Sequence, residues 1–202
     1  DYLNPITTQW VNIRKTADIW EPTTTDPFNF DAPTFFENNS FNLNHFTAVN
    51  NRNPSKAQID LGKKLFFDPN LSANHNMACV TCHSPNKGYA DGLTTSLDNN
   101  GKPLDRNTPT LINSAFQRSF FWDGRSETMI EQIASVFLNE KEFNTNVHQF
   151  SEDILKDSSY IKAFKAAYGK IPKKNTEVIK ALSSYISTLN SFNSRFDQNI
   201  RG

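Results

Sequence analysis

Two cysteines and a histidine form the pattern with the clearest chemical meaning in this sequence. Cys79, Cys82 and His83 follow one another as C-V-T-C-H, in a chain that has 2 Cys and 4 His in all. Such a pair attaches haem c through two thioether bonds, and the adjacent imidazole binds the iron. With so few Cys and His, coincidence is a poor explanation of this spacing. The pattern therefore favours one covalently attached haem.

Three other interpretations of the two thiols are weaker. A redox-active pair needs a thioredoxin-like βαβ context, and the flanking sequence shows no strand pattern. A zinc site needs four ligands, whereas Cys79, Cys82 and His83 supply three, with His75 as a strained fourth. Two buried thiols beside an unrelated histidine form the purely structural alternative.

Covalent haem also predicts where the protein works. The attachment takes place outside the cytoplasm, so we expect a periplasmic protein. The sequence starts at Asp1 and lacks the hydrophobic segment of a signal peptide, which we interpret as the processed end of an exported chain.

The composition excludes other functional classes. The 21 Lys and Arg balance the 21 Asp and Glu, so the chain lacks the basic excess typical of a nucleic-acid binder, and we expect no nucleic-acid partner. No run approaches the ~18 apolar residues that a membrane-spanning helix needs. Hydrophobic residues make up only 37% of the chain, but 17 Phe supply large apolar side chains for a core.

The elements that must position these residues divide into two regions. We expect residues 1–52 to form an irregular N-terminal arm, with a short helix over residues 7–19 followed by Pro- and Phe-rich chain. The prolines at positions 22, 27 and 33 forbid a long helix there. Its aromatic side chains are expected to pack on the main body. These are Phe28, Phe30, Phe35, Phe36, Phe41 and Phe46.

Residues 53–202 carry helical patterns, and no segment alternates as a strand does. Ser55 and Gln58 form a capping-box pair at the start of a first helix. Residues 84–110 predict a long loop that wraps a cofactor. Three later helices are expected: one capped by Ser126 and running to Phe137, one over residues 159–168, and a final one from about Asn175 to Phe192. The predicted class is all-α with long loops.

From about residue 53 to residue 202 the sequence resembles the peroxidatic (first) haem domain of bacterial di-haem cytochrome c peroxidases. The shared motifs are LGKKLFFD (61–68), the C-x-x-C-H of 79–83, RNTPT (106–110), FWDGR (121–125) and FDQNIRG (196–202). The resemblance implies a cytochrome c-like helical haem domain. The family's second haem domain normally follows such an ending, and this sequence has no second C-x-x-C-H. We therefore expect that domain on the same precursor or on another chain.

The resemblance also implies roles for individual residues. His83 would be the proximal iron ligand. Glu142 matches the distal acid–base carboxylate, and Gln132 matches the distal amide. Trp122 matches the tryptophan between the two haems. Two further residues of the long loop are Arg106, assigned to the cofactor, and Asn107, which matches a side chain that helps to bind calcium.

The proposed chemistry explains these residue types. Peroxide must bind opposite His83; its inner oxygen must lose a proton and its outer oxygen must gain one before water leaves. A carboxylate such as Glu142 can do both in turn. The neutral amide of Gln132 can donate and accept hydrogen bonds without titrating.

Composition alone gives plainer interpretations of the same residues. Glu142 would be an exposed carboxylate, Gln132 an ordinary helix residue, Asn107 a turn residue, and Trp122 first of all a packed core residue. The remaining histidines are expected to be surface or capping residues rather than ligands. They are His45, His75 and His148.

One position departs from the family pattern. Many members have a second histidine sixteen residues after the proximal one, where this chain has Asn99. Asparagine is a poor haem ligand, so we expect the distal side to be open or to hold only water.

The expected function is the reduction of hydrogen peroxide to water, with electrons from a cytochrome-type donor that arrive through the second haem. One alternative is a mono-haem electron-transfer cytochrome, for which Met129 is the only methionine after His83 and is expected in the core. The other is a related haem oxidase that acts on a protein or organic substrate.

Overall fold

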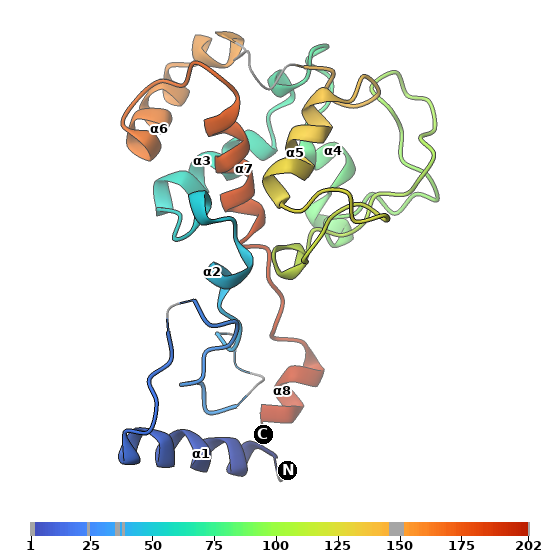
Figure 1. Cartoon of the computed structure of the whole chain (residues 1–202). Coiled ribbons are helices and arrows are strands. Elements are labelled where there is room, and N and C mark those ends of the chain that lie inside the picture. Colours follow the sequence, from blue (N-terminus) through green and yellow to red (C-terminus); the bar gives the residue numbers. More distant parts are fainter. Residues whose placement is uncertain (1–2, 24, 35–36, 38, 146–151, 202) are drawn as a thin grey trace.

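The computed structural model in Figure 1 describes residues 3–23, 25–34, 37, 39–145 and 152–201, and within these ranges the chain is helical. Strand-like pairing in the described part is limited to isolated bridges such as that between Phe120 and Ser126. The all-α class is therefore confirmed. The α-helices are α1 (Leu3–Ala17), α2 (Leu43–Phe46), α3 (Lys56–Phe66), α4 (Cys79–Cys82), α5 (Met129–Leu138), α6 (Ser158–Tyr168), α7 (Thr176–Ile186) and α8 (Arg195–Arg201).

The hydrophobic core lies where α3 packs against both α6 and α7, and α5 packs against α7. Leu61 and Leu65 of α3 are buried against Val178 and Leu182 of α7, as their helical spacing requires. At Gly62 the two helices come so close that a Cβ atom would lie 1.9 Å from the carbonyl oxygen of Ala181. Only glycine fits at this crossing.

The start of α3 is confirmed, whereas the predicted start of α5 is wrong. Ser55 and Gln58 form the expected reciprocal capping box. At α5 the N-cap is Thr128, whose hydroxyl accepts from the N–H of Glu131 while the Glu131 carboxylate accepts from the N–H of Thr128. Ser126 instead pairs with Phe120 through backbone hydrogen bonds. Thr128 and Glu131 thus each accept a hydrogen bond from the backbone N–H of the other. Ser126 cannot form this pair, because Met129, three residues later, has no side-chain oxygen.

The C-terminal helices differ in part from the expectation. α6 ends at Gly169, whose φ of +70° suits glycine, as expected. α7 begins after Asn175 but ends at Ile186, so it is shorter than predicted, and it is not the final helix because α8 follows. Phe192 lies beyond the helix, where its ring stacks 5.3 Å from that of Phe41. Packing against the arm overrides the helical periodicity in this segment.

The N-terminal arm packs on the body through aromatic side chains, as predicted. The rings of Phe41 and Phe46 each lie 5.4 Å from that of Phe116, which in turn contacts Phe192 at 5.3 Å. We call Phe41, Phe46, Phe116 and Phe192 the phenylalanine cluster. Phe35 and Phe36 lie outside the described residues. The boundary after residue 52 stays a prediction.

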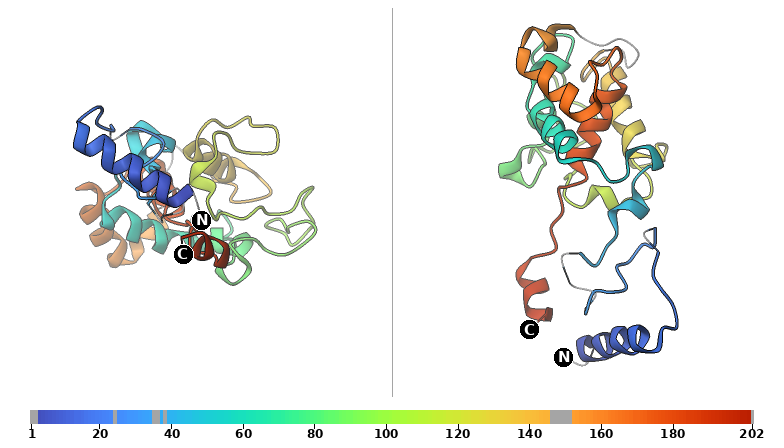
Figure 2. Two further views of the ribbon diagram at one scale, coloured as in Figure 1. Left: turned by 90° about the horizontal axis from the view of Figure 1, so that it is seen from below. Right: turned by 90° about the vertical axis from the view of Figure 1, so that its left-hand side faces the viewer.

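α1 is longer than the predicted helix and lies at the opposite end of the molecule from α4 (Figures 1 and 2). Pro5 falls in its first turn, where no helical N–H is needed. Arg14 is buried and holds the following chain, because its guanidinium donates to the carbonyl of Trp20 (2.7 Å) and to Asp31. In the part of the chain that the structure describes, no helix combines the length and apolarity that crossing a membrane requires.

Candidate functional site

The two cysteines lie on α4, a single helical turn that places residues three apart on the same face. The N–H of Ala78 donates to the Thr81 hydroxyl (3.0 Å) and fixes the start of this turn. Burial raises the pKa of Cys79 to about 12 and also raises the pKa of Cys82. The unattached cysteines are therefore neutral thiols. Neutral, half-buried thiols on one face suit thioether attachment.

His83 follows directly after α4, and the backbone carbonyls of Tyr89 and Pro109 both act on its ring. Its Nδ1 lies 3.0 Å from the carbonyl oxygen of Tyr89, which assigns the proton to Nδ1 and leaves Nε2 for a metal. Burial lowers the pKa of His83, while the Tyr89 carbonyl partly opposes this. The imidazole is therefore neutral, which is the form that binds iron.

Tyr89 is a site residue that sequence reasoning missed. Its backbone has a φ of +58°, which aims its carbonyl at His83, and its hydroxyl lies 3.2 Å from that of Tyr185 on α7. A positive φ at a tyrosine has no sequence signature, so only the structure identifies this role.

Asp91 is a second residue that sequence reasoning missed. It is buried in the loop after α4, and the N–H of Leu93 donates to its Oδ1 (2.9 Å). Burial raises its pKa, but hydrogen bonds, first that from the Ser96 hydroxyl, outweigh this effect and lower the pKa overall. Its negative charge raises the pKa values of Cys82 and His83 and so acts directly on the C-x-x-C-H segment.

Glu142 lies in the turn that follows α5, and the structure brings it to α4. Its charge raises the pKa values of both Cys79 and Cys82. Burial raises the pKa of Glu142 itself, while the side-chain amide of Asn139, which donates to its Oε1 (2.9 Å), opposes this effect. A half-buried carboxyl with a raised pKa is suited to proton transfer.

Gln132 lies in the middle of α5, and its Oε1 is buried without a hydrogen-bond partner. Buried polar atoms are nearly always satisfied, so an orphaned acceptor points to a group that the site has yet to receive. Separately, the two thiols on one face of α4 and the Nδ1-bonded imidazole of His83 fit the attachment and ligation of haem c.

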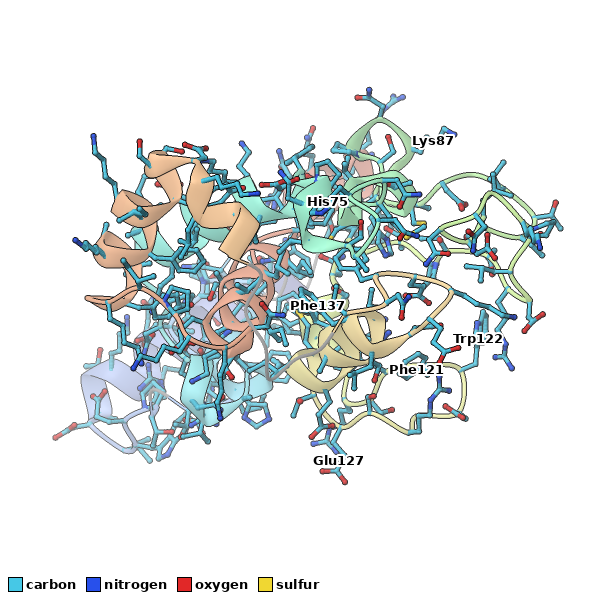
Figure 3. The ribbon with its side chains drawn as sticks, turned by 90° about the horizontal axis from the view of Figure 1, so that it is seen from above. His75, Lys87, Phe121, Trp122, Glu127 and Phe137 are labelled. Carbon is cyan, nitrogen blue, oxygen red and sulfur yellow. The ribbon has the colours of Figure 1, made fainter. Side chains whose placement is uncertain are left out.

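Trp122 is 74% exposed, so the expectation that it packs in the core is wrong for this chain. It lies at the end of a loop closed by the N–H of Phe120, which donates to the carbonyl of Ser126 (2.8 Å), and Figure 3 shows it at the periphery beside Phe121. The Arg125 guanidinium covers the ring of Phe121, at 3.3 Å. The ring of Phe121 is therefore covered, while that of Trp122 is open.

Arg106 and Asn107 both lie exposed in the long loop. They come directly before Thr108, whose side chain hydrogen-bonds to Cys82. The carbonyl of Arg106 accepts from the N–H of Ser96 (3.1 Å), so its backbone helps to close this loop. Within the described residues no three His, Cys, Asp or Glu side chains gather as they would around a metal ion.

The remaining candidates lie where the sequence suggested. Met129 begins α5 and packs partly buried against the core. His75 is exposed, and the Nδ1 of His45 lies 2.8 Å from the carbonyl oxygen of Thr25 in the arm. His148 lies outside the described residues.

Comparison with known proteins identifies the family. The sequence profile described as di-haem cytochrome c peroxidase matches residues 56–202. The chain belongs to the di-haem cytochrome c peroxidase family. The shared region includes α4, His83 and the turn with Glu142, and haem c is the cofactor that membership implies.

Individual relatives cover the same region. The chain is 35% identical over 150 residues to the cytochrome c551 peroxidase of Pseudomonas aeruginosa, covering 73% of this chain and 43% of that protein. It is also 35% identical over 142 residues to the methylamine utilization protein MauG of Methylophilus methylotrophus, covering 70% and 42%. A MauG-like protein associated with microbial copper homeostasis has a similar structure, with a TM-score of 0.70 and 25% identity over 77% of this chain and 47% of that one. The chain thus spans less than half the length of these relatives.

Proposed function

We propose that this chain is a peroxidatic haem domain that reduces hydrogen peroxide to water. The observation that carries the proposal is the position of Glu142, a half-buried carboxyl with a raised pKa that acts electrostatically on the C-x-x-C helix. Haem attached at Cys79 and Cys82 and ligated by His83 supplies the iron that binds peroxide and accepts electrons. The overall reaction consumes two electrons and two protons for each peroxide and releases two waters.

In this proposal, side chains of this chain transfer the protons and orient the peroxide. Asn139 holds Oε1 of Glu142, so Oε2 is the oxygen available to take the proton from the inner peroxide oxygen and return it to the outer one. The unpartnered Oε1 of Gln132 accepts a hydrogen bond from the bound peroxide and orients it. Tyr89 keeps His83 in the tautomer that leaves Nε2 for iron.

The proposal also specifies the haem content, the electron donor and the cellular compartment. The chain holds one haem, its distal side opposite His83 is open or holds water, and the second electron comes through a haem domain on the same precursor or on another chain. A cytochrome-type protein donates the electrons, and the reaction takes place in the periplasm. Trp122 is exposed and thus available to such a domain, and Asn107 contributes to a calcium site at that interface.

The mono-haem cytochrome alternative is disfavoured by Met129. That alternative needs a methionine sulfur at the iron, and the Met129 side chain packs against the apolar core instead. The substrate-oxidase alternative uses the same site residues, so only turnover assays distinguish it from a peroxidase. A peroxidase reduces peroxide with electrons from reduced cytochrome, whereas the oxidase oxidises a protein or organic substrate.

The test replaces Glu142 by glutamine in the haem-loaded protein. Gln keeps the size and the Oε1 acceptor for Asn139 but cannot take a proton, so the rate of reaction of the ferric protein with peroxide should fall by about 10²–10⁴-fold. Stopped-flow absorbance of the haem measures this rate. Glu140→Gln is the matched control, since Glu140 is an exposed carboxylate two residues away. Equal rates for the two variants would contradict the proposal.

A further inference from the structure

Asn99 contacts three consecutive peptide carbonyls of the turn that carries Glu142. Its side-chain Nδ2 donates to the carbonyl oxygens of Glu140 (2.8 Å) and Glu142 (2.9 Å). Its backbone N–H donates to the carbonyl oxygen of Lys141 (2.9 Å). These bonds join residues more than forty positions apart, and Asn99 is only 8% exposed. They therefore form in a setting from which water is largely excluded.

The rest of the turn is held mainly from within. Asn139 accepts from the N–H of Glu142 through its carbonyl and from the N–H of Lys141 through its Oδ1 (both 3.0 Å). Directly after the glutamate, Phe143 is buried and its carbonyl accepts from the N–H of Ala73 (2.8 Å). The bonds from Asn99 are thus the long-range hydrogen bonds that fix the stretch from Glu140 to Glu142.

Asn99 is itself held in place on two sides. Its carbonyl accepts from Nδ2 of Asn76, three residues before Cys79 (2.8 Å). The N–H of the neighbouring Asp98 donates to the carbonyl oxygen of Lys102 (2.7 Å). The Asp98 carboxylate accepts from the backbone N–H groups of Asn100 and Lys102 (both 2.8 Å). Asn99 therefore links the segment leading into α4 to the turn that carries Glu142.

The carboxamide is the side chain that this arrangement needs. Two carbonyls require two donors from one short side chain, and asparagine supplies both on a single nitrogen. Aspartate has the same shape but no donor, so it would place a negative charge against two carbonyl oxygens. Alanine would leave both carbonyls without this partner.

We propose that Asn99 is a positioning residue that sets the place of the Glu142 carboxyl relative to the haem-attachment helix. The proposal rests on the proposed function, because it assigns to Glu142 the proton transfer described above. Asn99 acts through the turn and touches neither substrate nor haem in this role. A displacement of about 1 Å in a reacting group can lower a rate by about 10²-fold, so the link matters for the reaction as well as for the fold.

The first test measures the turn without reference to activity. Asn99→Asp and Asn99→Ala are compared with the unaltered haem-loaded protein by amide hydrogen exchange followed by mass spectrometry. Exchange in residues 140–144 should become faster by about tenfold, while exchange in α3 and α7 stays unchanged. Asn51→Asp and Asn51→Ala are matched controls, because Asn51 is 7% exposed and hydrogen-bonds to Ser183 and Ser184 of α7, away from this turn.

The second test asks whether Asn99 acts through Glu142. Asn99→Ala should slow the reaction of the ferric protein with peroxide by about 10²-fold, whereas adding it to Glu142→Gln should cause no further loss. A merely structural role would instead give additive losses. Asn51→Ala should leave the rate unchanged.

Several results would overturn the inference. Unchanged exchange in residues 140–144, faster exchange throughout the molecule, or additive losses in the double variant would each do so. If Glu142→Gln is slow but Asn99→Ala reacts at the unaltered rate, the inference fails and the proposed function stands. If Glu142→Gln reacts at the unaltered rate, both fail together.

Discussion

Glu142 gives the proposed reaction a pH dependence whose sign follows from its environment. Burial raises the pKa of this carboxyl above its ordinary value of 4.5, and the hydrogen bond from Asn139 only partly opposes this. The protonated carboxyl cannot accept the peroxide proton. We therefore expect the rate of reaction with peroxide to rise with pH, with a midpoint above 4.5. Stopped-flow measurements across this range test the expectation, and a midpoint below 4.5, or the same profile in Glu142→Gln, would contradict it.

Single residues were predictable from the sequence to the extent that their signal is local. Cys79, Cys82 and His83 are adjacent, and their spacing alone indicates their joint role. The packing of Trp122 was predicted wrongly, because an aromatic residue after two phenylalanines suggests a core, whereas its loop holds it 74% exposed. The bonds from Asn99 to the Glu142 turn depend on a fold that brings together residues more than forty positions apart. A single sequence carries no signal for such a contact.

Among the helices, the crossing of α3 and α7 leaves no room for a side chain at Gly62. A Cβ at Gly62 would lie 1.9 Å from the Ala181 carbonyl oxygen, so the two helices would have to separate. We expect Gly62→Ala to lower the free energy of unfolding by about 1–3 kcal/mol, although alanine favours helix. Urea unfolding measures the change. Lys63→Ala is the neighbouring exposed control and should have little effect; equal stability of the two variants would show that the crossing can relax.

The limits of a helix were predictable where a local capping signal marks them, as at Ser55 and Gly169. Ser55 with Gln58 and Thr128 with Glu131 both satisfy the same four-residue capping rule, whereas Ser126, the predicted cap of α5, has no such partner three residues later. The end of α7 had no such rule. Apolar spacing continues to Phe192, but that ring is used by the arm rather than by the helix core.

At the scale of the whole molecule, the phenylalanine cluster attaches the arm to the body. Phe116 contacts Phe41 and Phe46 of the arm and Phe192 after α7. Each aromatic pair contributes about 0.5–1.5 kcal/mol beyond burial, so Phe116→Ala should loosen the arm. We expect limited proteolysis to cleave within residues 1–52 faster, while the haem absorption spectrum stays unchanged. Phe67→Ala, which removes a 43% exposed phenylalanine elsewhere, is the control, and equal cleavage of the two variants would exclude this role.

The proposal of a single haem makes a prediction for the intact chain. One C-x-x-C-H motif in 202 residues should add the mass of one haem under denaturing conditions, because thioether bonds survive unfolding. Intact mass spectrometry measures this directly. Replacing both Cys79 and Cys82 by alanine should abolish the added mass, and a remaining covalent haem would contradict the assignment.

Tryptophan fluorescence can report on the separation between α1 and α4. Two of its three tryptophans, Trp10 and Trp20, lie on or just after α1, at the far end from the helix that would carry the porphyrin (Figure 1). Porphyrins quench indole emission by energy transfer that falls steeply with separation. Emission from these two indoles should therefore be quenched more strongly the closer the arm lies to the haem-attachment helix.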